Sequence, residues 1–161
     1  MTGMQMPKPS KFHKKLDALV GDWTGEETMH PTPWDPKGGT AKGRYKVKPA
    51  FGGFGVVQEY EQKRGGKTSY VGHGVLGYDA KDNCYLWHWS DSMGGVPNQV
   101  TKGTWTDKTL VFTNACEQGH SRYTYVFKKP GVIDFSIEHS MDGQQWSPFM
   151  NGRYTRKPAK R

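Results

Sequence analysis

The chain has 161 residues, which is enough for one domain that buries its own core, and its two cysteines exclude a disulfide scaffold. Only 34% of the residues are apolar, whereas 13% are aromatic and 21 are glycine; this composition favours strands and turns, and it excludes a coiled coil and an apolar membrane span. The net charge of +8 comes from the termini, because residues 16–152 hold 14 basic and 15 acidic residues, so no folded nucleic-acid-binding surface is indicated.

The chain is expected to open with a flexible basic tail over residues 1–9 and a short helix over residues 11–20. Ser10 can cap this helix, and Gly21 suits the position just past its end. The apolar residues of the segment share one helical stripe: Phe12, Leu16, Leu19 and Val20.

About ten short strands are predicted after the helix, separated by turns every 10–15 residues. Such spacing favours an antiparallel up-and-down meander, which would close into a barrel because closure removes exposed strand edges. A β-sandwich is the alternative architecture. The expected strands cover residues 22–29, 41–48, 56–63, 68–78, 83–90, 99–106, 109–115, 120–128, 132–141 and 144–154.

The strands and the helix are expected to form a single all-β domain over residues 10–157, followed by a second flexible basic tail at residues 158–161. No apolar secretion segment is visible near the N-terminus, so we expect a cytoplasmic protein. In that compartment Cys84 and Cys116 would be reduced thiols. The basic tails would either keep the protein soluble or bind an anionic polymer or membrane weakly.

Two turns allow a prediction of strand register. If Gly65 and Gly66 form a two-residue loop, Arg64 pairs with Lys67. If residues 79–82 form the next loop, Tyr78 pairs with Asn83. Together these pairings place His73 opposite His88, on one sheet face with Gln58 and Tyr60, and they place Trp87 and Trp89 on the other face, over Gly72 and Gly74.

The histidine face is predicted to line the barrel. The opposite face carries Glu59 and Glu61, whose charges favour solvent, although the two tryptophans would then also point outward. A one-residue error in either turn would exchange the two faces, because successive side chains of a strand alternate sides.

No complete catalytic or metal-binding motif is recognisable. His73 and His88 could be metal ligands, an acid/base pair or simply hydrogen-bonded partners, but two imidazoles fall short of a zinc site. Residues 72–77 match G-x-G-x-x-G without the helix that a dinucleotide site needs, so no cofactor and no metal is expected. No sequence motif links the carboxylates Glu26, Glu27 and Asp91 to a catalytic partner.

The segment 16–26 resembles the opening of calycin barrels such as lipocalins and fatty-acid-binding proteins, in which a short helix leads into Gly-x-Trp. This resemblance implies that Trp23 plugs one end of the barrel and that a late arginine packs over it. Arg156 matches that arginine best, and Arg153 is the alternative. A guanidinium over an indole is also favourable in its own right.

A closer resemblance spans residues 16–157, where short motifs follow one another in a characteristic order. The chain is similar to the bacterial domain-of-unknown-function family 1579, which implies a calycin-like barrel and no established activity. The motifs are Glu59-Tyr60, Gly72-His73-Gly74, Gly77-Tyr78-Asp79, Trp89-Ser90-Asp91-Ser92-Met93 and Tyr154-Thr155-Arg156-Lys157.

A weaker resemblance links the same opening, Gly21-x-Trp23-x-Gly25 followed by His30-Pro31-Thr32, to nitrobindin-type haem barrels. That family implies a proximal histidine in the final strand, but residues 144–154 contain none. Haem would therefore need another histidine. The candidates are His73, His88 and His139.

The sequence is interpreted as a binding barrel for a small apolar or amphipathic ligand, with Trp23 and Arg156 closing its base. The alternatives are an enzyme with His73 or His88 as general base, a haem barrel, and an interaction protein that uses its outer surface. We expect no specific nucleic-acid partner and no membrane span, and a homodimer is left open. The residues predicted to contact the ligand are Gln58, Tyr60, His73 and His88.

Overall fold

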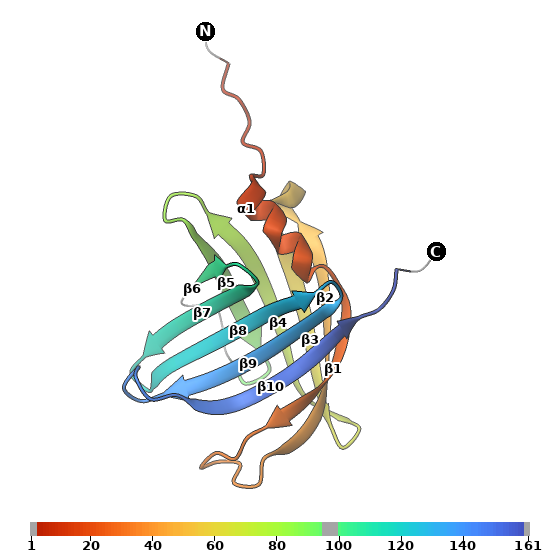
Figure 1. Ribbon diagram of the computed structural model, residues 1–161, viewed down its shortest axis with the longest axis vertical. Coiled ribbons are helices and arrows are strands. Elements are labelled where there is room, and N and C mark those ends of the chain that lie inside the picture. Colours follow the sequence, from red (N-terminus) through yellow and green to blue (C-terminus); the bar gives the residue numbers. More distant parts are fainter. Residues whose placement is uncertain (1–2, 95–99, 160–161) are drawn as a thin grey trace.

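Ten antiparallel strands form a closed barrel in the computed structural model, which describes residues 3–94 and 100–159 (Figure 1). Each strand pairs with its neighbours in sequence, and β1 also pairs with β10, which closes the cylinder. The all-β up-and-down barrel predicted from the sequence is thus confirmed. The strands are β1 (Gly21–Met29), β2 (Gly39–Ala50), β3 (Gly55–Arg64), β4 (Lys67–Asp79), β5 (Cys84–Asp91), β6 (Thr101–Thr106), β7 (Thr109–Cys116), β8 (Gly119–Lys129), β9 (Val132–Ser140) and β10 (Ser147–Arg156).

A short helical segment covers one end of the barrel (Figure 1). It consists of α1 (Lys11–Lys14) and the 3-10 turn η1 (Lys15–Leu19). Only the first half of the predicted helix is therefore α-helical. Ser10 caps it as expected, accepting a hydrogen bond from the Phe12 backbone at 3.2 Å. A second 3-10 turn, η2 (Phe51–Gly53), lies between β2 and β3 at this end.

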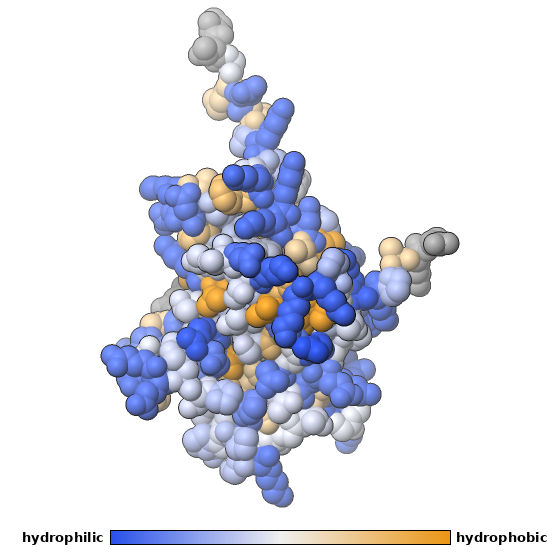
Figure 2. All heavy atoms as spheres, viewed as in Figure 1, coloured by the Kyte–Doolittle hydropathy of each residue, from blue (hydrophilic) through white to orange (hydrophobic). Residues whose placement is uncertain are grey.

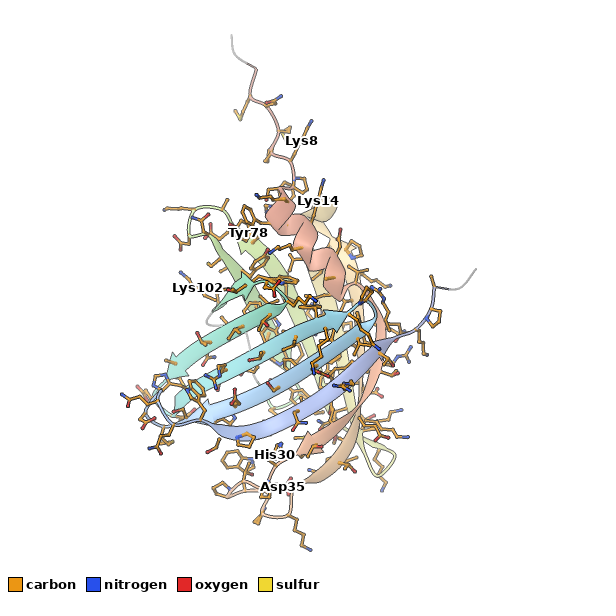
Figure 3. All side chains as sticks on the ribbon, in the orientation of Figure 1. Lys8, Lys14, His30, Asp35, Tyr78 and Lys102 are labelled. Atoms are coloured by element: carbon orange, nitrogen blue, oxygen red, sulfur yellow. The ribbon has the colours of Figure 1, made fainter. Side chains whose placement is uncertain are left out.

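The half of the barrel nearest the helix is filled with side chains. Leu16 and Leu19 of the helical segment are buried, and they pack against inward-pointing residues at the adjoining strand ends. Figure 3 places Tyr78 beside the helix, with His30 and Asp35 at the opposite end of the molecule. We call the helix end the closed end and the other the open end. The inward residues near the closed end are Val47, Val56, Leu76, Tyr85, Leu110 and Ile133.

The predicted interior face is correct for β3 and wrong for β4 and β5. Gly65 and Gly66 do form the loop, with Arg64 opposite Lys67, but the pairing shifts by one residue at Ser69. This bulge is held by the Ser69 hydroxyl, which donates to the backbone and side-chain oxygens of Gln62 at 3.3 and 3.1 Å. From Tyr70 onward every side chain of β4 is therefore on the face opposite to the predicted one.

The loop between β4 and β5 also differs from the prediction, although it does not reverse any face. Asp79 pairs with Cys84, so the loop covers residues 80–83. Asn83 adopts a positive φ of 51° there, a conformation that asparagine tolerates better than most residues. As a result His73 lies opposite Ser90, and His88 lies opposite Val75, so the predicted histidine pair does not exist.

The tryptophans of β5 point into the barrel and cover glycines of β4. A side chain at Gly72 would collide with the Trp89 ring, and one at Gly74 would come within 2.8 Å of the Trp87 indole nitrogen. This is the packing of rings on glycine that the sequence predicted, now on the inner face. The large rings make these two glycines necessary.

The surface is mostly hydrophilic on the face drawn in Figure 2, where hydrophobic atoms form small areas, mainly over β7 to β10 and near α1. Among the described residues, no helix is long and apolar enough to cross a membrane.

Candidate functional site: the barrel cavity

A cavity of about 700 Å³ occupies the half of the barrel toward the open end. Its lining residues come from the strand ends that lie farthest from α1. The walls are predominantly aromatic and apolar, with a few polar groups among them, as is typical of small-molecule sites. The aromatic lining consists of Tyr45, Tyr60, Tyr70, Trp87, Trp89, Tyr123, Phe135 and Phe149.

A buried carboxylate, that of Glu27, lies directly behind this wall. Its side chain is 1% exposed. Tyr60 donates a hydrogen bond to Glu27 Oε1 at 2.6 Å, and Gln62 Nε2 donates to Oε2 at 2.7 Å. The Tyr154 hydroxyl also donates to Oε1. Three donors meet two oxygens, which is the pattern that an ionised carboxylate accepts.

The local sequence makes room for this network with glycines at inward positions. A Cβ at Gly43 would collide with the Glu27 carboxylate. One at Gly152 would lie 3.0 Å from the Tyr154 hydroxyl, and one at Gly25 would lie 2.7 Å from the Tyr154 ring. The small residues on β1, β2 and β10 therefore allow one acid and one tyrosine to fill the same layer of the barrel.

The tyrosines around Glu27 are held in their protonated, hydrogen-bond-donating form. Burial raises the pKa of Tyr60 and Tyr154 above the ordinary range, and the negative charge of Glu27 raises the pKa of both further. Burial also raises the pKa of Tyr45, whose ring stacks on Tyr60 with centroids 4.5 Å apart. Tyr60 and Tyr154 therefore remain hydrogen-bond donors to Glu27 at neutral pH.

A second carboxylate, that of Asp91, lies in the cavity wall at the end of β5. It accepts hydrogen bonds from the Tyr70 hydroxyl at 2.9 Å and from Trp89 Nε1 at 3.1 Å. Trp89 Nε1 also lies 2.8 Å from the Tyr70 oxygen. Both acidic groups are thus surrounded by aromatic hydrogen-bond donors.

Two buried polar atoms of the described residues that lie close together have no hydrogen-bond partner: Gln58 Oε1 and Trp87 Nε1. Gln58 Oε1 and Trp87 Nε1 both approach the inner side of Gly74. Unpartnered buried groups cost stability, so they are uncommon and often mark functional regions. Trp87 is one of the lining residues of the cavity, and Gln58 Oε1 lies beside the same glycine as its indole nitrogen.

Of the predicted ligand contacts, Gln58 and Tyr60 lie inside the barrel, at 2% and 7% exposure. His73 and His88 lie on the outer face, so their predicted place in the lumen is wrong. The cause is the bulge at Ser69, which reverses β4 and, through pairing, β5. His73 Nδ1 instead lies 2.5 Å from the Glu59 carboxylate, in an exposed pair.

Trp23 and Arg156 have the predicted arrangement at the closed end. They are directly paired on β1 and β10, and the guanidinium lies 5.3 Å from the centre of the indole. Trp23 Nε1 donates to the Leu19 carbonyl at 2.8 Å, and Arg156 Nη1 lies 3.3 Å from the Val20 carbonyl oxygen. These bonds tie the helical segment to the barrel. Arg153, the alternative, pairs instead with Asp134 on the outside, at 2.6 Å.

His139 is the one histidine that lines the cavity, since all six histidines belong to the described part of the chain. It lies near the open end, with Nδ1 3.0 Å from the Ser121 hydroxyl and its ring 4.9 Å from that of Phe149. Cys116 also lines the cavity, while Cys84 is half-buried on β5. The described residues contain no group of three or more side chains that could hold a metal ion.

Glu27 is the main site residue that the sequence analysis missed. Its partners Gln62, Tyr60 and Tyr154 are 33 to 127 residues away in sequence, so no local motif connects them. A usable signal was nevertheless present. If Trp23 plugs the barrel, strand alternation places Glu27, four residues later, on the same inner face.

The family model described as "Protein of unknown function (DUF1579)" matches residues 8–156. The chain belongs to this family. None of the curated proteins is similar enough to match. The resemblance found in the sequence is thereby confirmed, and the family carries no established activity.

Two solved structures have the same fold. Rv2717c from M. tuberculosis aligns with a TM-score of 0.69 at 12% identity, covering 94% of this chain and 100% of that one. The S-type phycobiliprotein lyase CPES from Guillardia theta aligns with a TM-score of 0.64 at 12% identity, covering 96% of this chain and 100% of that one. At this identity the likeness concerns the fold alone.

Proposed function

We propose that this protein binds a small, apolar or amphipathic molecule inside the barrel. The observation that carries the proposal is the cavity of about 700 Å³, which falls within the roughly 300–1,000 Å³ of typical ligand sites. A barrel that served only as a scaffold would gain stability by filling this space with side chains. Here one half is filled and the other is left open.

The polar groups of the cavity would orient the ligand. Tyr60 and Gln62 line it and are fixed by their bonds to Glu27, so they present hydrogen-bonding atoms at little entropic cost. Gln58 is a further candidate contact, since its side-chain oxygen has no partner. Trp23 and Arg156 would support the site indirectly, by holding the closed end together.

The haem and enzyme alternatives both depend on His139, because it is the histidine in the cavity wall. A haem ligand would use Nε2, since Nδ1 is close to Ser121. A general base would have the Ser121 hydroxyl beside it, 3.0 Å from Nδ1, but no hydrogen bond among the described residues supplies a third group that orients the His139 ring. Binding is therefore the function that the geometry supports best.

The proposal is tested by native mass spectrometry of the purified protein beside its denatured mass, with an absorbance spectrum of the same sample. A small molecule that leaves on denaturation is the expected result if the natural ligand is held tightly. A Soret band would favour haem instead. If the protein is isolated empty, it is titrated with the neutral fluorescent probe N-phenyl-1-naphthylamine, and 1:1 binding is expected.

Two tryptophan substitutions show where the probe binds. Asn114 lines the cavity, whereas its neighbour Thr113 is exposed on the outer face of β7. Asn114→Trp would project an indole into the cavity and weaken probe binding at least about tenfold, while Thr113→Trp would leave it unchanged. Equal binding by both variants, or no binding by the native chain, would overturn the proposal.

A further inference from the structure

Glu27 is a buried charge without a counter-ion. Its three hydrogen-bond donors are the neutral groups of Tyr60, Tyr154 and Gln62. Among the described residues, no lysine, arginine or histidine forms an ion pair with it. Buried carboxylates in proteins are normally paired with a cation or bound to a metal, and no metal-binding cluster is present in this part of the chain.

The cavity wall between Glu27 and the lumen is aromatic. The rings of Tyr60 and Tyr70 have centroids 5.8 Å apart, and those of Tyr60 and Trp89 are 6.4 Å apart. Trp87 and Trp89 meet edge to face at 5.4 Å. Faces of such rings attract cations through their quadrupoles, and a ring wall around a positive group is a known way to bind quaternary ammonium ions.

The charged groups that line the cavity also favour a positively charged ligand. Asp91 contributes a second carboxylate. Arg64 is the basic group at the mouth, but its guanidinium is held by Asp35 at 3.0 Å and by the Gly38 carbonyl at 2.9 Å. His139 is the remaining titratable nitrogen base in the wall. The interior therefore favours positive charge, although the chain as a whole carries +8.

We propose that the ligand carries a positive charge on an apolar body, as an alkylamine or a quaternary ammonium compound does. Its cationic group would lie against Tyr60 and the neighbouring rings, where it compensates the Glu27 carboxylate, and its apolar part would extend toward the open end. This inference rests on the proposed function and defines the ligand class that the cavity takes.

The test compares three twelve-carbon amphiphiles below their micelle concentrations, by calorimetry. Dodecyltrimethylammonium is cationic, dodecyldimethylamine oxide is a neutral compound of similar shape, and dodecyl sulfate is anionic. We expect the cation to bind about tenfold or more tightly than the neutral compound, with the anion weakest. Because non-specific attraction by a protein of charge +8 would rank the anion first, this order cannot arise from the overall charge.

The variant Glu27→Gln links the preference to the buried carboxylate. It should lose most of the cation preference, measured as the ratio of the dissociation constants of the neutral and the cationic compound, whereas Thr113→Trp should behave as the native chain. If Glu27→Gln does not fold, Asp91→Asn replaces it, with a smaller expected loss of the same preference. Comparable binding of all three amphiphiles, blocked by Asn114→Trp, would overturn the inference and leave the binding function intact. If none of the three amphiphiles binds, both this inference and the proposed binding function are contradicted.

Discussion

The hydrogen bond between Tyr154 and Glu27 should be measurable as a loss of stability when it is removed. Tyr154 is 1% exposed, and its hydroxyl donates to Glu27 Oε1. Tyr154→Phe keeps the ring, with its edge-to-face contact to Tyr45 at 4.9 Å, and deletes only the hydroxyl. The change therefore isolates the polar interaction from the packing.

The expected cost is about 2 kcal/mol in the free energy of unfolding. A hydrogen bond to a charged group contributes roughly 1.5–3 kcal/mol, and Glu27 retains the donors Tyr60 and Gln62, which argues against the upper limit. For a domain of this size the melting temperature should fall by about 4–8 °C. Urea unfolding followed by circular dichroism measures the free energy, and thermal melting provides a second determination.

Tyr78→Phe is the matched control, because its hydroxyl is exposed and lies 3.3 Å from the Asn83 side-chain oxygen. It should change the free energy of unfolding by less than about 0.5 kcal/mol. The effects of Tyr154→Phe and Glu27→Gln should also be non-additive in a double-mutant cycle. An unchanged stability of Tyr154→Phe, or strictly additive effects, would refute the network described around Glu27.

Three further predictions concern pH and the closed end. The Arg153 hydrogen bond, with help from Lys128, lowers the pKa of Asp134 to about 2. Because the folded pKa lies below the unfolded one, the stabilisation is fully present above about pH 4 and is lost as the pH falls through about 2, so in urea titrations Asp134→Asn should cost about 1 kcal/mol at pH 7, after solvent screening, and only a small part of that at pH 2. Burial raises the pKa of Tyr85 to about 12 and that of Tyr60 and Tyr154 further, so stability should fall as the pH rises above about 10, and tyrosinate absorbance at 295 nm should increase together with unfolding rather than before it. Arg156→Met should lower the free energy of unfolding in urea by about 0.5–1 kcal/mol, whereas an unchanged stability would mean that the guanidinium does not contribute there.

The strands and their order were predictable because turn residues and alternation are local signals. Gly65 and Gly66 both adopt positive φ in their hairpin loop, as the sequence suggested. The helix was also predictable from Ser10 and the apolar stripe, although the sequence did not distinguish its α-helical half from the 3-10 half.

The interior face of β4 and β5 could not be derived in the same way. It depends on one extra residue, Ser69, whose hydroxyl stabilises a bulge. No turn pattern in the sequence predicts this bulge. The exposed charges of Glu59 and Glu61 correctly indicated the outer face of β3, and the two tryptophans opposite glycines correctly indicated close packing. Each of these two signals was correct for its own strand. The error arose because the face assignment of β3 was extended to β4 and β5 without the bulge at Ser69.

The cavity itself lies beyond sequence reasoning, because its volume depends on how side chains from nearly all the strands pack together. The Glu27 network illustrates this. Its members come from β1, β3 and β10, and the glycine that accommodates it comes from β2. Only the closed barrel brings these four strands into one layer.

The most direct test of ligand binding inside the barrel is the response of individual indole N–H resonances in a ¹H–¹⁵N spectrum during titration with the neutral probe. Trp87 and Trp89 line the cavity, whereas Trp34 is 72% exposed and Trp146 packs under Arg122 on the outside. The binding account predicts saturable shifts of the Trp87 and Trp89 resonances, with those of Trp34 and Trp146 nearly unchanged. Shifts confined to Trp34 or Trp146 would place the probe on the outer surface and contradict it.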